Sequence, residues 1–168
     1  MVAPAHPEFI FAGVLMKQLL AASETDNSYC LFENSSLGQS GTPIHVHANE
    51  DETLYVLAGE MQVLIAGEAR TLKQGEVVFL PRGIPHQLKN VSDRPSQYLI
   101  LCLPSGFERF VAAGGRPRLK DEQPSSPSPQ EIARMRAAAP HFGLKLLSNW
   151  ESGQPGRPQG SEKTDNDK

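Results

Sequence analysis

The sequence predicts an all-β fold, an antiparallel sandwich or closed barrel, followed by a short helical extension. From about residue 9 to residue 104, short apolar runs recur at even spacing, and tight-turn signals rich in Gly and Pro separate them. No helical segment intervenes between the runs. Many short strands at this spacing are typical of sandwiches and small barrels. The expected strands are residues 14–20, 28–34, 44–48, 53–58, 61–66, 69–72, 76–80, 86–91 and 97–103. Gly67-Glu68 lies between two of these runs and predicts a hairpin there.

The chain changes character after residue 104. Residues 107–113 predict a short helix that ends at Gly114, and residues 116–127, rich in Pro, Ser and charge, predict a mobile connector. Ser128, Pro129 and Glu131 combine an N-cap, a first-turn proline and a capping-box glutamate, which predicts a helix over 129–139. Residues 141–150 are apolar enough to pack on the barrel.

We therefore expect four segments: a flexible N-terminus (1–8), a β-barrel (9–104), a helical extension packing on it (105–150) and a disordered tail (151–168). The tail carries no aliphatic or aromatic side chain, so it cannot bury enough surface to offset its ordering entropy.

Composition excludes several classes of protein. A net charge of −3 and a pI near 5.9 give no electrostatic footprint for nucleic acid. Cys30 and Cys102 lie in apolar strand-like runs, as buried free thiols do in a reducing compartment. Lys17 and Gln18 interrupt the apolar N-terminal stretch, and no basic residue precedes it. We expect a cytoplasmic protein with no membrane span.

Two sequence blocks carry candidate metal ligands. In the first, His45 and His47 are two residues apart, so a strand projects both imidazoles to one face, whereas a helix would separate them. Glu52 opens the next apolar run and can reach the same ion from the adjacent strand. Glu50 and Asp51 are its competitors, and for both a solvated acidic turn is the favoured interpretation.

The second block runs from Gly75 to Asn90 and contains Pro81, Gly83 and His86. Pro81 and Gly83 indicate a turn before a strand, and Asn90 is expected to satisfy backbone groups in a turn. His86 can reach the first block only through tertiary closure of the fold.

His6 and His141 are expected to have surface or packing roles rather than to bind metal. One lies at the frayed N-terminus and the other follows Pro140 near a helix end.

Together the two blocks resemble the paired motifs of the cupin superfamily. The first motif reads His45-Val-His47, four residues, Glu52, six residues and Gly59, and the second is met at every defined position from Gly75 to Asn90. One departure is visible, since the glycine expected six residues before the first histidine falls on Gln39.

The resemblance implies a double-stranded β-helix, or jelly-roll barrel, that holds one divalent transition metal on His45, His47, Glu52 and His86. Fe²⁺ is the first expectation for the metal, with Mn²⁺, Ni²⁺, Co²⁺, Cu²⁺ or Zn²⁺ as alternatives, because ligands alone do not decide metal identity.

Within the superfamily, the first block and the helical extension are similar to quercetin 2,3-dioxygenase-like proteins. This implies an oxidoreductase, a metal-dependent dioxygenase that cleaves a small flavonol- or enol-like molecule. Glu52 would be the catalytic residue, serving as ligand and as base with a pKa raised by its apolar surroundings. Two alternatives remain: a non-redox isomerase or polyketide-type cyclase, and a small-molecule-binding or sensory protein without turnover.

The expected partners are a small-molecule substrate and a second copy of the chain, with no nucleic acid and no membrane. Edge strands within residues 14–34 are the expected homodimer surface. Four aromatic residues of the extension are candidates to line a pocket, although ordinary core packing is the favoured interpretation: Phe107, Phe110, Phe142 and Trp150.

Overall fold

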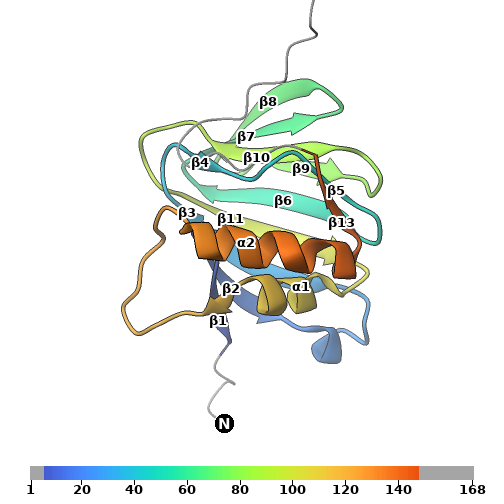
Figure 1. Ribbon diagram of the computed structural model, residues 1–168. Helices are drawn as coiled ribbons and strands as arrows, with labels where there is room; N and C mark the ends of the chain where they lie inside the picture. Colours follow the sequence, from blue (N-terminus) through green and yellow to red (C-terminus); the bar gives the residue numbers. More distant parts are fainter. Residues whose placement is uncertain (1–5, 148–168) are drawn as a thin grey trace, which may run out of the picture.

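The computed structural model of the protein describes residues 6–147 (Figure 1). Two antiparallel sheets face each other and enclose the core. The first sheet has the strand order β12-β1-β2-β3-β11-β6-β9, and the second has the order β13-β5-β10-β7-β8, with β4 also paired to β10. The predicted jelly-roll barrel is confirmed. The disordered tail expected for 151–168, Trp150 and most of the N-terminal segment lie outside the described residues.

The elements of the first sheet are β1 (Glu8–Phe11), β2 (Val14–Leu20), β3 (Cys30–Ser36), β6 (Asp51–Ala58), β9 (Val77–Leu80), β11 (Ser96–Leu103) and β12 (Arg116–Pro117). Those of the second are β4 (Ser40–Gly41), β5 (His45–His47), β7 (Glu60–Ile65), β8 (Glu68–Lys73), β10 (His86–Asn90) and β13 (Leu144–Leu146). The helices are η1 (Ala22–Glu24), α1 (Phe107–Gly114), α2 (Pro129–Ala138) and η2 (Ala139–Phe142).

All nine expected strands are present, with ends moved by no more than two residues. Their side chains alternate between core and surface, as in β3, where Cys30, Phe32 and Asn34 are buried and the residues between them are partly exposed. The centre of the core consists of large side chains with at most 2% exposure from both sheets: Phe32, Leu54, Val56, Met61, Val63, Leu72 and Leu80.

The hairpin expected around Gly67 joins β7 to β8. Ala66 and Gly67 both have positive φ, 49° and 86°, which is the backbone of a type I′ turn and matches the twist of a two-stranded ribbon. Cys30 and Cys102 are buried free thiols, as expected, and they lie opposite each other on β3 and β11.

The C-terminal extension adds a strand to each sheet of the barrel, which the sequence does not predict. The capping box of α2 is confirmed, since Glu131 N donates to Ser128 Oγ at 3.2 Å and Ser128 N donates to Glu131 Oε2 at 2.8 Å. The mobile connector predicted for 116–127 is wrong: β12 pairs with β1, and Arg116 forms ion pairs with Glu122 and Glu131.

After α2, β13 adds a strand beside β5, with Leu144 opposite His47 and Leu146 opposite His45. In Figure 1 the two helices lie together on one side of the barrel, α2 above α1. The extension therefore contacts the strand that carries the H-x-H pair.

The strand order contradicts the expectation that residues 14–34 form edge strands available to a second subunit. Residues 14–34 form β2 and β3, which have neighbours on both sides, so they are not edge strands. β9 is one of the strands at a sheet edge, and its Val77 and Phe79 are 51% and 57% exposed and lie opposite Tyr55 and Thr53 of β6. A homodimer stays a prediction, and the apolar edge at β9 is now the surface where we expect it.

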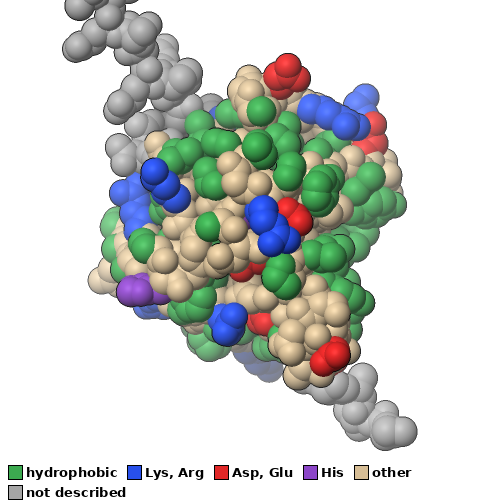
Figure 2. Space-filling view, turned by 90° about the vertical axis from the view of Figure 1, so that its right-hand side faces the viewer, with side chains coloured by type: hydrophobic (Ala, Val, Ile, Leu, Met, Phe, Trp, Pro, Cys, Tyr) green, Lys and Arg blue, Asp and Glu red, His purple; other side chains and the backbone are tan. Residues whose placement is uncertain are grey.

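Figure 2 shows hydrophobic groups between isolated charges on one face of the molecule, with no continuous field of Lys and Arg among the described residues there. Over residues 6–147, no helix is both long and apolar enough to cross a bilayer.

The pairing of β13 with β5 generates a prediction. Ala48 N donates to Gly143 O, and Leu147 N donates to Ile44 O, so by alternation the N–H of Lys145, midway between, faces β5. Lys145→Pro should lower the free energy of unfolding by about 1 kcal/mol or more, because proline has no N–H to donate. It should also raise the dissociation constant for Zn²⁺, measured by competition with a chromophoric chelator.

Lys145→Ala is the matched control, since it keeps the N–H and should leave both quantities close to wild type. Equal behaviour of the two variants would show that β13 does not support the H-x-H strand.

Candidate metal centre

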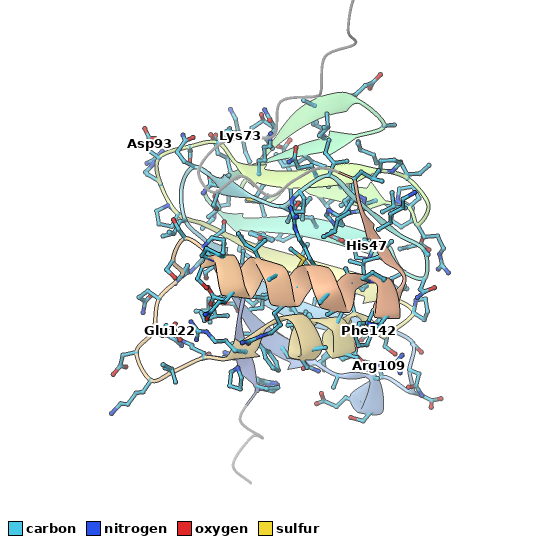
Figure 3. The ribbon with its side chains drawn as sticks, in the orientation of Figure 1. His47, Lys73, Asp93, Arg109, Glu122 and Phe142 are labelled. Carbon is cyan, nitrogen blue, oxygen red and sulfur yellow. The ribbon has the colours of Figure 1, made fainter. Side chains whose placement is uncertain are left out.

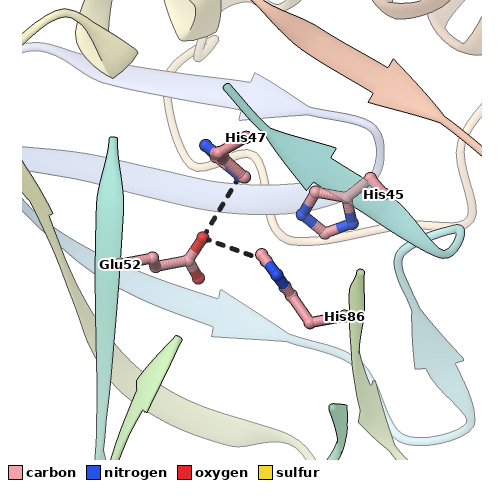
Figure 4. A group of neighbouring side chains, drawn as sticks. All are labelled: His45, His47, Glu52 and His86. Atoms are coloured by element: carbon pink, nitrogen blue, oxygen red, sulfur yellow. Dashed lines mark ion pairs between the residues drawn. The ribbon is translucent and has the colours of Figure 1, made fainter. Parts of the chain in front are cut away.

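Four side chains from three strands converge inside the barrel (Figure 4). One ligand atom from each of His45, His47, Glu52 and His86 lies within 4.8 Å of the others, and all four residues are buried. Glu52 Oε2 is 3.3 Å from His47 Nε2 and 3.6 Å from His86 Nε2. The structure therefore brings together all four residues that the sequence singled out as metal ligands.

Strand geometry explains how residues far apart in sequence meet. His45 and His47 alternate with the half-buried Val46 on β5, so both rings enter the interior, and Figure 3 shows His47 pointing inward from the ribbon. His86 on β10 is the direct partner of His45 across the sheet. Glu52 comes from β6 in the opposite sheet, so the cluster bridges the two walls of the barrel.

The loop between β9 and β10 is attached to the same strand. Gly83 N donates to His47 O at 2.8 Å, which anchors the turn that leads into His86. Asn90, as expected, satisfies backbone groups: its Nδ2 donates to Leu37 O at 3.1 Å and to Arg94 O at 2.7 Å.

Backbone carbonyls orient two of the three rings. His45 Nδ1 lies 2.9 Å from Pro43 O, and His86 Nδ1 lies 3.1 Å from Ile84 O. A ring that donates from Nδ1 carries its lone pair on Nε2, which is the arrangement a metal-binding imidazole needs.

The cluster's charges are set by burial and by mutual interaction. Burial, together with the charges of His86 and His47, lowers the pKa of His45 to about 3. The pKa of His86 is raised, because the nearby carboxylate of Glu52 and the carbonyl of Ile84 outweigh the effect of burial.

The raised pKa expected for Glu52 is wrong. Burial does raise the pKa of this carboxyl, but the adjacent His86 ring and the charges of the three histidines outweigh it and lower the pKa to about 2. Glu52 is therefore ionised, as a metal ligand must be.

Unpartnered atoms test whether a metal fits. His47 Nε2 and His86 Nε2 are buried and have no hydrogen-bond partner among the described residues. Buried polar nitrogens without partners are rare and costly. A divalent transition metal would satisfy them, and three imidazoles with one carboxylate are a donor set suited to such an ion, with positions left open. The residues present fit the metal.

Glu50 was missed by sequence reasoning, which favoured a solvated turn. It is only 4% exposed, and its Oε2 lies 3.5 Å from His47 Nδ1. A carboxylate behind a metal-binding imidazole orients the ring and raises its basicity. No local signal separates it from Asp51, which is partly exposed and pairs with Arg82 at 2.9 Å.

His6 is half-buried and His141 exposed, and neither belongs to the cluster found among the described residues. Both stay outside the metal site, as expected.

The structure shows how Gln39 takes the place of the glycine expected before the first motif. Gln39 adopts φ 54°, the left-handed conformation that glycine favours, and its Nε2 donates to Val91 O at 2.7 Å. The approach loop thus keeps the backbone shape with a different residue. At Gly59, φ is 77° and an added Cβ would lie 2.9 Å from Pro95 O, so a side chain is excluded there.

A cavity that is partly open to solvent adjoins the cluster. Its walls come from both sheets and from the extension, including Phe107 and Phe110 of α1, Met135 of α2 and Leu144 of β13. The ring of Phe107 lies 5.6 Å from that of His47, measured between centroids. Phe107 and Phe110 therefore line the pocket in addition to packing in the core, while Phe142 packs behind Phe110.

Comparison with known proteins agrees with this arrangement. Residues 36–102 match the family model of the cupin domain, and this segment contains all four clustered residues. This segment is therefore similar to the cupin domain in sequence, and the jelly-roll barrel is consistent with that similarity.

Two sequence relatives illustrate the range of similarity. An uncharacterized protein of Aquifex aeolicus is 39% identical over 49 residues, which is 29% of this chain and 40% of that protein. The tetracenomycin polyketide synthase protein TcmJ of Streptomyces glaucescens is 29% identical over 105 residues, covering 61% of this chain and 67% of TcmJ. The chain spans less than two thirds of several curated relatives it matches, among them the Aquifex protein.

A crystal structure of a predicted oxalate decarboxylase from Thermotoga maritima superposes with a TM-score of 0.55 at 24% identity, covering 62% of this chain and 96% of that one. The structure of KdgF from Halomonas sp. gives 0.52 at 20% identity, with coverages of 58% and 84%. At these identities the likeness establishes the fold.

Removal of a ligand tests the cluster directly. His86→Ala should reduce bound metal from about one ion per chain to a small fraction, because three donors remain and one position of the site opens to water. The far-ultraviolet circular dichroism should stay that of a folded β protein, since the core supplies most of the stability. Metal analysis after dialysis measures the loss.

His141→Ala is the control and should keep its metal. Unchanged stoichiometry in His86→Ala would show that the cluster is not the metal site.

The position of Glu50 generates a second prediction. Glu50→Gln should weaken metal binding about 10- to 100-fold, the usual effect of losing a carboxylate behind a ligating histidine. Asp51→Asn, one residue away but at the surface, should bind metal like the wild type. Titration of both variants with Co²⁺, followed by its visible absorption, separates them, and equal affinities would contradict a role for Glu50.

Proposed function

We propose that this protein is a metal-dependent dioxygenase acting on a small, neutral, flavonol- or enol-like molecule. The observation that supports this best is the pairing of a four-residue metal cluster with an apolar cavity. The substrate enters beside the cluster, and the cavity selects it by shape and by the absence of charge.

The cavity walls favour a neutral, aromatic substrate. Beyond the cluster they are mostly aromatic and aliphatic, and the described lining residues include no Lys or Arg. A carboxylate substrate would therefore find no cationic side chain there. Burial raises the pKa of Tyr98, so its hydroxyl stays protonated and adds no charge.

A redox-active divalent ion, when bound, supplies coordination positions for a substrate oxygen and for dioxygen. His45, His47 and His86 hold that ion through nitrogens whose orientation the backbone and Glu50 maintain. Phe107 and its apolar neighbours exclude water from the space beside His47, which protects reactive species and strengthens local electrostatics.

Glu52 is proposed to serve both as ligand and as proton acceptor. Its histidine neighbours keep the carboxylate ionised, so it is ready to receive a proton. Enolic and phenolic hydroxyls are more acidic than aliphatic alcohols, so they are the groups from which a carboxylate takes a proton more readily.

The alternative of a non-redox isomerase or polyketide-type cyclase has one observation in its favour, the similarity to TcmJ, whose name places it with a polyketide synthase. The same cavity and cluster would serve this chemistry, with the metal as Lewis acid. The two proposals differ in their requirement for dioxygen.

Oxygen consumption distinguishes them. The protein, loaded separately with Fe²⁺, Mn²⁺, Co²⁺ or Ni²⁺, should consume dioxygen with a flavonol or catechol and should form no product under anaerobic conditions. Glu52→Gln should lower the rate at least about 100-fold, the usual range for losing an acid–base group. Glu68→Gln, at an exposed position on β8, should leave the rate unchanged.

Product formed without dioxygen would refute the dioxygenase in favour of the isomerase or cyclase. Tight binding with no product in either atmosphere would refute both enzymes in favour of a binding or sensory protein.

A further inference from the structure

Asn34 is a polar residue on the cavity wall that the metal cluster does not use. It lies on β3, is 2% exposed and lines the cavity together with His47 and Glu52. Its Oδ1 is buried and has no hydrogen-bond partner among the described residues. By contrast, Thr42, which lines the cavity from the side of the second sheet, is engaged, since its Oγ1 accepts from Leu88 N at 3.1 Å.

A buried amide oxygen without a partner weakens the folded state, because it loses its hydrogen bonds to water and gains none. Such groups are few in native proteins and often have a role in function. Asn34 is surrounded by apolar wall residues, among them Met16 and Tyr98, its direct partners on β2 and β11. Neither of these two neighbours donates a hydrogen bond to Asn34 Oδ1.

The strand registers place Asn34 at a set distance from the cluster. Glu52 lies opposite Cys102, which lies opposite Cys30, so these three form one row across the sheet. Asn34 is four residues beyond Cys30 on β3, which corresponds to about 13 Å along the strand at about 3.3 Å per residue.

The row between the two is apolar. It consists of Leu54, Ile100 and Phe32, which are direct partners across β6, β11 and β3. The cavity thus has a polar, metal-binding end and a second polar point, separated by an apolar stretch.

We propose that Asn34 is a second anchor for the substrate, forming a hydrogen bond with a hydroxyl or carbonyl group remote from the metal. The ligand that fits is a neutral, elongated molecule of at least two aromatic rings, with one oxygen beside Glu52 and another near Asn34. An amide both donates and accepts, so either group is recognised, and the absence of charge on Asn34 matches a neutral partner.

This inference rests on the proposed function only in placing the substrate in this cavity, and it does not depend on turnover. A fixed hydrogen-bonding group that the substrate must satisfy discriminates strongly against analogues that lack the matching oxygen. Asn34 is thus a specificity-determining and positioning residue.

Binding to the Zn²⁺-loaded protein tests the proposal without redox chemistry. The probes are quercetin and galangin, two flavonols that differ in the hydroxyls of the outer ring, which galangin lacks. The wild type should bind quercetin about tenfold more tightly than galangin, as expected for one buried hydrogen bond. Asn34→Leu, similar in size but without polar atoms, should bind both equally, with galangin affinity unchanged or improved.

Thermal unfolding of the ligand-free protein gives an independent readout. Asn34→Leu should unfold at the same or a higher temperature than the wild type, because it removes an unsatisfied buried amide. A lower unfolding temperature would show that Asn34 is structural, satisfied for example by a buried water, and would overturn the proposal. An unchanged quercetin-to-galangin ratio would overturn it equally.

Glu33→Gln is the matched control, because Glu33 is adjacent to Asn34 on β3 but faces away from the buried side and does not line the cavity, and it should keep the wild-type ratio. The two proposals fail separately. Selective binding that depends on Asn34 without oxygen uptake would refute the dioxygenase alone, and oxygen uptake with an unchanged binding ratio would refute the role of Asn34 alone.

Discussion

The cross-strand pairing of β5 with β10 places His45 directly opposite His86, and the metal cluster depends on this register. Because side chains alternate faces along a strand, a slip of one residue would turn both rings out of the barrel. The pairing is held on both flanks: β13 continues the sheet beyond β5, and β7 continues it beyond β10. Glu52 then completes the cluster from the opposite sheet. The four residues therefore meet only when the two sheets pack against each other.

Placing four polar side chains in an apolar interior is costly unless they satisfy one another. The carbonyls of Pro43 and Ile84 lie at the Nδ1 atoms of His45 and His86, Glu50 lies 3.5 Å from His47 Nδ1, and the carboxylate of Glu52 faces the Nε2 atoms of His47 and His86. Three buried ring nitrogens, both of His47 and Nε2 of His86, still have no hydrogen-bond partner among the described residues. The same apolar surroundings that make the cluster costly also line the adjoining cavity, where Asn34 is a second polar point. In the proposed function, these surroundings favour both a metal at the cluster and a neutral ligand beside it.

Local patterns in the sequence predicted much of this molecule. The nine central strands, the capping box of α2 and the four clustered residues all have short-range signatures: alternation of apolar residues, an N-cap serine, and fixed spacings of His, Glu and Gly. What escaped prediction depends on tertiary contacts. The strands β1 and β13 are recognisable only by their pairing partners, and the connector after α1 is ordered by the ion pairs of Arg116. Glu50 and Asp51 are adjacent acidic residues, and only the fold decides that one is buried behind His47 and the other pairs with Arg82. The pKa of Glu52 was misjudged because burial alone was considered, without the histidines beside it.

X-ray absorption spectroscopy at the metal edge of the Fe²⁺- or Zn²⁺-loaded protein tests the central claim most directly. A cluster of His45, His47, Glu52 and His86 predicts a first shell of nitrogen and oxygen only, with outer-shell scattering from about three imidazoles. In His45→Ala the fitted number of imidazoles should fall by about one in any metal that remains bound. A first shell containing sulfur from Cys30 or Cys102, or one imidazole or none, would contradict the cluster as the metal centre of this barrel.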